Sequence, residues 1–200
     1  DAGKRGTNKE EKRMKTSLQT PYSSYIIRKL EPEEKVKSFD CGDTDLNDFI
    51  LNESNHYRKA LLAVTYVFES ADDEGHNNIA AYFSLANDRV SMSDFPDKTA
   101  FNRFRKHRFV NEKRLKSYPA AKICRLAVSQ NLKGQHIGEF LIRAIKSYFL
   151  ADNKTGCRFL TVDVYSAATE FYLKQKFVPL TSAEEDSTTR LLYFDLNDLT

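Results

Sequence analysis

The chain has 200 residues, 40% of them hydrophobic, and carries a formal net charge of +3. This length suits one domain and leaves little for a second, and so small a charge indicates no class of partner by itself. No segment approaches the roughly 20 apolar residues of a membrane span, so we expect no membrane-embedded part.

The cysteines and the first residues set the expected compartment. Cys41, Cys124 and Cys157 lie far apart, and none belongs to a CxxC pair or to a Cys/His cluster with zinc spacing, so no metal site is expected. Unpaired thiols predict a cytoplasmic protein. Residues 1–20 lack the apolar centre of a signal peptide and are interpreted as a disordered or loosely ordered basic tail, ahead of one domain over residues 21–200.

The first half of this domain is predicted to begin with a strand over residues 25–30, followed by a helix that Asp43 or Thr44 can cap. Apolar side chains recur at helical spacing after that cap. Two β-rich runs, residues 61–68 and 79–85, are separated by turn-prone residues, which predicts a hairpin with a long loop.

The second half alternates between strands and helices. A basic, partly helical stretch over residues 95–116 precedes a buried strand over 122–128, and the clearest helix begins at about Gln135. The apolar side chains of that helix form one stripe, off which Arg143 and Lys146 are predicted to lie. The remaining elements are a strand over 157–164, a helix over 167–175 and strands over 177–180 and 190–196. This order predicts an α/β fold with a mixed sheet, partly parallel at its centre.

A short glycine-containing loop joins the strand 122–128 to the clearest helix. Gly134 and Gly138 allow backbone amides to approach an anion, and the dipole of the following helix favours negative charge there. The loop has neither the Gly-Lys-Ser/Thr of a Walker loop nor the spacing of a dinucleotide fingerprint. Alone, it indicates either a phosphate cradle or a simple turn of the chain.

Two segments together resemble the GNAT superfamily of N-acetyltransferases. Residues 133–138 are similar to its acetyl-CoA motif, Arg/Gln-x-x-Gly-x-Gly/Ala, and residues 165–177 to its Asn-x-x-Ala-x-x-Phe-Tyr-x-x-x-Gly-Phe region. The matching residues of the second segment are Ala168, Phe171, Tyr172 and Phe177, and the departures are His136 in the first segment and Tyr165 and Lys176 in the second. The resemblance covers about residues 25–197 and implies the GNAT acyl-CoA N-acyltransferase fold, with a mixed central sheet flanked by helices.

The resemblance also implies acetyl-CoA as cosubstrate and assigns its contacts. The pantetheine arm would pair with Leu126, Ala127 and Val128. The pyrophosphate would lie on amides of the loop residues Lys133, Gly134, Gln135, His136, Ile137 and Gly138.

The same resemblance gives Tyr172 the role of protonating the departing CoA thiolate. A phenol with a pKa near 10 is a suitable donor to a thiolate whose conjugate acid has a pKa near 8.5. The alternative interpretation of Tyr172 is an aromatic side chain packed on an amphipathic helix. We expect an ordinary, negative φ at His136, and a left-handed Lys176 would cost about 1 kcal/mol.

No general base is evident, since Glu69, Asp163 and the histidines are candidates by residue type only. Without a base, an α-amine with a pKa near 8 is a better acceptor than a lysine ε-amine with a pKa near 10.4. A narrower resemblance, carried by Phe39-Asp-Cys-Gly42 and by the runs at 80–85, 124–128 and 189–194, is to a GNAT branch that includes toxins of toxin–antitoxin pairs.

Toxins of that branch acetylate the amino group of aminoacyl-tRNA, which implies tRNA as acceptor and an antitoxin as partner, and leaves a homodimer open. Two other functions also remain open: a small-molecule or peptide N-acetyltransferase, and a catalytically silent acyl-CoA-binding module. The basic stretch over residues 101–116 has seven Lys or Arg against one acid. It could contact RNA phosphates with aromatic stacking, or receive an acidic protein. We favour a surface helix whose phenylalanines face the core.

Overall fold

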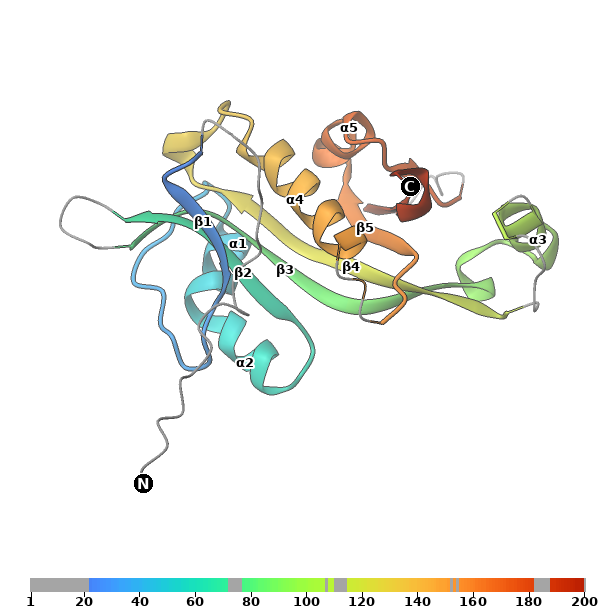
Figure 1. Cartoon of the computed structure of the whole chain (residues 1–200), viewed down its shortest axis with the longest axis horizontal. Coiled ribbons are helices and arrows are strands. Elements are labelled where there is room, and N and C mark those ends of the chain that lie inside the picture. Colours follow the sequence, from blue (N-terminus) through green and yellow to red (C-terminus); the bar gives the residue numbers. More distant parts are fainter. Residues whose placement is uncertain are drawn as a thin grey trace, which may run out of the picture. The chain divides into compact units, whose positions relative to one another are not determined.

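The computed structural model describes residues 22–71, 77–106, 108–109, 115–151, 153, 155–181 and 188–199. Within these residues one seven-stranded sheet has the order β1-β2-β3-β4-β5-β7-β6, of which Figure 1 labels β1 to β5. The chain divides into two compact units. The first comprises the residues up to Phe83 together with Ala127–Ile137, and the second comprises Ser84–Leu126 and the residues from Gly138 onwards. The basic tail predicted for residues 1–20 lies outside the described residues.

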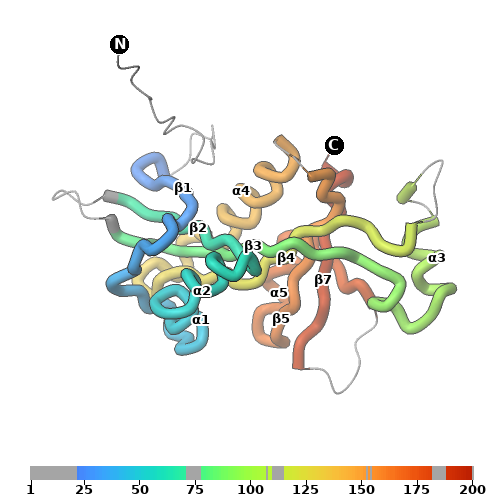
Figure 2. The backbone as a smooth tube through the Cα atoms, turned by 90° about the horizontal axis from the view of Figure 1, so that it is seen from below, coloured from blue at the N-terminus to red at the C-terminus, as the bar shows by residue number. Residues whose placement is uncertain are grey.

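The first unit is built on an antiparallel pair of strands. β1 (Tyr25–Lys29) pairs with β2 (Val64–Ala71), with Tyr25 opposite Ser70. Between them, α1 (Thr44–Asp48), a π-helical turn (Phe49–Glu53) and α2 (Ser54–Lys59) form one continuous helical segment, whose α2 part lies beside β2 (Figure 2). The Asp43 carboxylate accepts a hydrogen bond from the Leu46 amide at 3.1 Å, which confirms Asp43 as the cap.

The core of the first unit gathers side chains from the strands, the helical segment and the loop before it. Its buried members are Leu30, Phe39, Cys41, Phe49, Ile50, Val67, Tyr82 and Ala127. The Tyr82 hydroxyl donates to the Leu46 carbonyl at 2.6 Å, so the one polar atom of this large ring is satisfied. The helical periodicity predicted for this segment is therefore confirmed.

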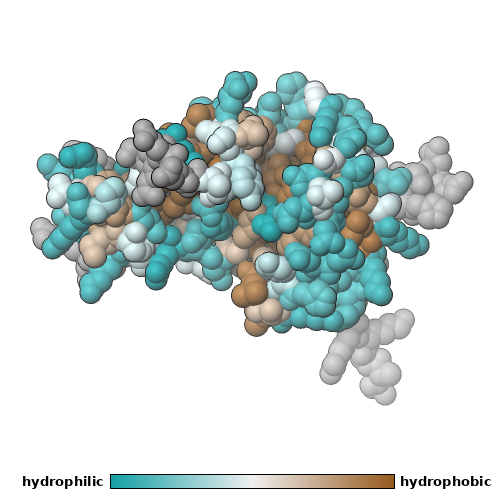
Figure 3. Space-filling model, turned by 180° about the vertical axis from the view of Figure 1, so that it is seen from behind, coloured by the Kyte–Doolittle hydropathy of each residue, from teal (hydrophilic) through white to brown (hydrophobic). Residues whose placement is uncertain are grey.

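The turn after α2 accounts for a difference from the sequence prediction. The Leu62 amide donates to the Tyr57 carbonyl, and Leu61 takes a left-handed φ of +58° with 91% of its surface exposed. β2 consequently begins at Val64 rather than at residue 61, because the two leucines that read as strand form the turn. Figure 3 shows a mainly hydrophilic face on which hydrophobic residues occur in small groups. None of the described helices is long and apolar enough to cross a membrane.

β3 (Asn77–Ser91) and β4 (Ser117–Val128) run through both units. The other elements of the second unit are α3 (Lys98–Lys106), α4 (Ile137–Ala151), β5 (Phe159–Tyr165), α5 (Ser166–Lys174), β6 (Val178–Pro179) and β7 (Thr189–Asp195). Only the first residue of α4, Ile137, belongs to the first unit. β4 pairs with β5 in parallel, whereas β5 and β6 each pair with β7 in the antiparallel sense. The predicted mixed sheet with a parallel pair at its centre is confirmed.

The basic stretch places its phenylalanines inward. Phe101 and Phe104 on α3 are 2% and 8% exposed and pack in a second core cluster with residues of β4, β5 and β7. The Arg108 guanidinium donates to the Tyr193 hydroxyl at 2.6 Å and lies 3.5 Å from the Asp195 carboxylate. The core-facing interpretation is confirmed for Phe101 and Phe104, so neither ring is available to stack on a base.

One prediction for α4 is wrong. Lys146 was expected off the apolar stripe, but it is 8% exposed, whereas Arg143 is exposed as expected. The apolar face is wider than the predicted stripe, because Ile142 is also fully buried and lies four residues, about one turn, before Lys146.

Candidate active site

The segment that follows β4 is fixed by backbone hydrogen bonds before the glycine loop begins. The Ser129 amide donates to the Ala80 carbonyl at 2.8 Å, and the Gln130 amide donates to the Asp40 carbonyl at 2.9 Å. A 3-10 turn over Gln130–Leu132 follows. The first unit therefore anchors the entry to the loop on both β3 and the Phe39–Gly42 motif.

The Phe39–Gly42 motif acts as a brace for this segment. The Asp40 carboxylate accepts from the Gly42 amide at 2.8 Å and from the Asn47 side chain at 2.9 Å. Gly42 has a φ of +79°, and a Cβ at this position would lie only 2.3 Å from Nε2 of Gln130. The left-handed angle favours glycine, and a side chain here would also displace the flexible end of Gln130.

The loop over residues 133–138 has an unusual backbone. Residues 133–136 are exposed, and left-handed φ values of +79° and +57° occur at Gly134 and His136. The prediction of an ordinary φ at His136 is wrong. The Tyr22 hydroxyl, distant in the sequence, donates to the Gln135 carbonyl and restrains the peptide that precedes His136, whose left-handed φ costs about 1 kcal/mol. Left-handed residues that alternate with right-handed ones can turn backbone amides toward one side, as in an anion-binding nest.

The last loop glycine is explained by packing in the second unit. A Cβ at Gly138 would lie 3.2 Å from the Phe171 ring and 3.9 Å from the Leu126 side chain. Because that glycine has no side chain, the start of α4 packs closely against α5 and β4. This unit thus brings together the end of the first sequence motif, the first residue of the expected pantetheine strand and the Phe171–Tyr172 pair.

Tyr172 is buried between aromatic rings. Its side chain is 7% exposed, and its ring centroid lies 5.0 Å from that of Phe171 and 5.5 Å from that of Phe177. Its hydroxyl has no hydrogen-bond partner among the described residues. Burial raises the pKa of Tyr172, so the phenol is protonated at neutral pH but is a weaker acid than an exposed tyrosine.

The end of α5 forms a Schellman motif around that tyrosine. The Phe177 amide donates to the Tyr172 carbonyl at 3.1 Å, and the Lys176 amide donates to the Leu173 carbonyl at 2.9 Å. Lys176 has a left-handed φ of +64°, so the strain expected for a non-glycine residue at this position is present. The motif sets the backbone on both sides of Tyr172.

The candidate bases are engaged elsewhere. Glu69 is 1% exposed and accepts from Nε of Arg28 at 2.6 Å and from its NH2 at 2.9 Å. Asp163 pairs with Lys122, and His56 is exposed on α2. Two further candidate histidines, His76 and His107, lie outside the described residues.

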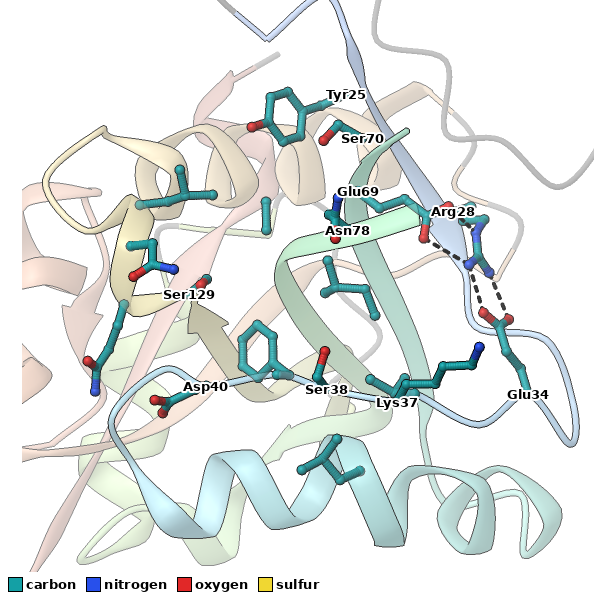
Figure 4. A pocket seen from close by; sticks show the side chains of 18 of the residues that line it. Tyr25, Arg28, Glu34, Lys37, Ser38, Asp40, Glu69, Ser70, Asn78 and Ser129 are labelled. Carbon is teal, nitrogen blue, oxygen red and sulfur yellow. Dashed lines mark hydrogen bonds and ion pairs between the residues drawn. The ribbon is translucent and has the colours of Figure 1, made fainter. Parts of the chain in front are cut away.

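A cleft of about 940 Å³ opens in the first unit (Figure 4). One end carries Arg28, whose guanidinium also donates to Glu34 at 2.7 and 2.8 Å, and the other end carries Asp40 and the segment Ser129–Leu132. Its lining has three cationic and three anionic side chains. The volume is in the range of small-molecule sites, which is about 300–1,000 Å³.

The described residues contain no cluster of three or more His, Cys, Asp or Glu side chains that could hold a metal ion. Among the candidate cofactor residues, Ala127 is buried, while Leu126 and Val128 are half-buried at the end of β4. The brace formed by Asp40 and Gly42 was missed in the sequence, although the Asp-x-Gly spacing is a signal for a side chain that caps a turn.

Comparison with known proteins gives the family. Residues 84–194 match the acetyltransferase (GNAT) domain family. Similar solved structures include a mutant of KacT, with 21% identity, a TM-score of 0.67 and coverage of 88% of this chain and 99% of that chain. AtaT complexed with acetyl-methionyl-tRNAfMet and AtaTR bound with AcCoA each show 22% identity, a TM-score of 0.67 and coverage of 88% and 96%. No curated protein sequence gives a significant match. Because the family match spans more than half of its residues, the chain belongs to the GNAT acetyltransferase family.

Proposed function

We propose that the protein transfers an acetyl group from acetyl-CoA to a primary amine by direct attack in a ternary complex. The observation that carries the proposal is the exposed loop with left-handed Gly134 and His136 directly before α4, in a chain of this family. We assign the pyrophosphate to the amides of residues 133–138 and the pantetheine arm to Leu126, Ala127 and Val128. The similar AtaTR structure bound with AcCoA supports this choice of cosubstrate.

In the proposed reaction, the neutral amine attacks the thioester carbonyl and a tetrahedral intermediate forms. Strand amides stabilise the negative charge that develops on the carbonyl oxygen. The C–S bond then breaks, the thiolate takes the proton of the Tyr172 hydroxyl, and the extra proton of the new amide passes through water back to the Tyr172 oxygen. The Tyr172 hydroxyl, which no described residue engages in a hydrogen bond, supports this role.

We propose the amino group of aminoacyl-tRNA as the acceptor, and the cleft beside Ser129–Leu132 as its entry. Since Glu69 and Asp163 are both paired, an amine that is already partly neutral at pH 7 is favoured. AtaT, which has been captured with acetyl-methionyl-tRNAfMet, supports this acceptor. A small-molecule or peptide amine is the alternative acceptor, and a silent acyl-CoA-binding module is the alternative without catalysis.

We further propose that residues 21–200 act as one domain, since β3 and β4 are continuous through both units. An antitoxin is a proposed partner, because a structure of a mutant of the toxin AtaT is bound to the C-terminus of the antitoxin AtaR, and a homodimer remains a proposal. Three free thiols among the described residues support a cytoplasmic site of action.

Two measurements test the function. Calorimetry on folded protein should show binding of CoA, and absence of binding heat would overturn the cofactor assignment. Labelled acetyl-CoA should then label aminoacyl-tRNA more rapidly than lysine peptides. A clear preference for lysine would overturn the acceptor, and binding without transfer to any amine would indicate the silent module.

A further inference from the structure

Lys146 is a buried cation that the reaction described above does not use. It lies on α4 with 8% of its surface exposed, and its Nζ is 3.5 Å from the centroid of the Phe194 ring and 5.1 Å from that of Phe177. No carboxylate pairs with it among the described residues. Burial lowers the pKa of Lys146 to about 8, and the positive charge of Lys176 adds to this effect. A buried charge without a counter-charge costs stability, so the lysine needs another explanation.

Its one hydrogen bond among the described residues points to the end of α5. Nζ donates to the Gln175 carbonyl at 2.6 Å. Gln175 is the C-cap of α5, where unpaired carbonyls carry the negative end of the helix dipole, so a cation is well placed there. The Gln175 amide in turn donates to the Tyr172 carbonyl at 3.0 Å.

Lys146 also contacts Phe177, the last residue of the Schellman motif at the end of α5. The Phe177 ring lies against both the ammonium group of Lys146 and the Tyr172 ring. The motif includes the strained, left-handed Lys176, which persists only when its surroundings hold it in place. The lysine therefore touches the C-cap and the aromatic residue that together set the position of Tyr172.

We propose that Lys146 is a positioning residue for Tyr172: its ammonium group fixes the last turn of α5 and the Phe177 ring, and through them directs the Tyr172 hydroxyl toward the departing thiolate. This inference rests on the proposed function, in which Tyr172 is the proton donor. A lysine retained only for stability would be better replaced by an apolar side chain of similar length. The loss of stability from the buried charge is offset when the lysine orients a reacting group, since small misplacements slow catalysis.

The test compares Lys146→Met with the wild type in single turnovers of acetyl transfer. Methionine keeps the length and apolar stem of lysine but removes the charge and the hydrogen bond. We expect the rate of transfer to fall roughly tenfold, less than the hundredfold that a 1 Å misplacement can cost. The KM for acetyl-CoA and the melting temperature should not worsen. Lys174→Met makes the same change on exposed α5 surface and should leave the rate unchanged. Lys146→Arg should recover part of the rate.

A double-mutant cycle separates positioning from a general structural role. In a Tyr172→Phe background the hydroxyl is gone, so Lys146→Met should cause little further loss of rate. An equal loss in both backgrounds would overturn the inference. A slow Tyr172→Phe variant beside an unchanged Lys146→Met variant would overturn only the positioning role, whereas an unchanged Tyr172→Phe variant would overturn the proton donor and this inference with it.

Discussion

Arg28 and Lys146, two cations with little solvent exposure in this acetyltransferase, have opposite kinds of bonding partners. In the first unit, the Arg28 guanidinium is shared by the carboxylates of Glu34 and Glu69, with N–O distances from 2.6 to 2.9 Å. In the second unit, Lys146 relies on one carbonyl and two ring faces. Charges that satisfy one another hold local structure together, whereas a lone cation lowers stability. The two cations therefore differ in their bonding partners rather than in their burial.

The largest expected effect concerns the network of the first unit. Arg28→Met removes two hydrogen bonds from the 1% exposed Glu69 carboxylate, so the free energy of unfolding should fall by about 3 kcal/mol, as for other broken buried pairs. Urea denaturation measures the loss. Lys59→Met, which removes an exposed pair with Glu33, is the control and should change stability by less than about 1 kcal/mol. Equal effects of the two substitutions would show that the network is not structural.

The second expected effect is a rise in stability at alkaline pH that comes from Lys146. The folded-state pKa of Lys146, about 8, lies below its ordinary value, so between about pH 8 and 10 the unfolded chain binds more protons. The free energy of unfolding should therefore rise with pH in this window, by roughly 3 kcal/mol at most, and Lys146→Met should lack this rise. Denaturation curves at several pH values give both slopes, and identical slopes would contradict the assignment.

At the acid end the Arg28 network dominates. Its guanidinium holds the pKa of Glu34 below the ordinary value by hydrogen bonding. The stabilisation is present above the unfolded pKa of about 4.3 and is lost as pH falls through the lower folded value. Glu34→Gln should flatten the acid limb of the stability curve and leave the alkaline limb unchanged. An unaltered acid limb would show that this carboxylate does not contribute.

The sequence predicted more of the backbone than of the site. The mixed sheet, α4 and α5 follow from periodicities that tertiary packing reinforces, such as the buried stripe of α4. The left-handed His136 could not be predicted, because the hydrogen bond between Tyr22 and the Gln135 carbonyl joins residues far apart in the sequence. Lys146 was predicted to lie off the apolar face of α4, because lysine side chains are normally exposed to solvent. Its spacing of four residues from Ile142 was the available signal.

A smaller effect tests how the first unit supports the cofactor loop. Gly42→Ala meets both a left-handed φ and the Gln130 side chain, and should lower stability by about 1–2 kcal/mol. Gly156→Ala is a matched control, since Gly156 has a similar φ of +74° but nothing within 4 Å of its added Cβ. Because Gln130 leads into the loop, only Gly42→Ala should also weaken CoA binding in calorimetry. Equal CoA affinities in both variants would show that the brace formed by Asp40 and Gly42 does not support the cofactor loop.

The smallest expected effect lies beside Lys146. Lys176→Gly relieves a left-handed φ of +64° at the position where Schellman motifs favour glycine, so it should raise the free energy of unfolding by somewhat under about 1 kcal/mol, because glycine also adds entropy to the unfolded chain. It also removes a like charge that lowers the pKa of Lys146, so the alkaline rise in stability should move to higher pH. Lys174→Gly, inside α5, should destabilise instead. A loss of stability in Lys176→Gly, measured by urea denaturation across that pH range, would mean that the Lys176 side chain, rather than its backbone, supports the end of α5.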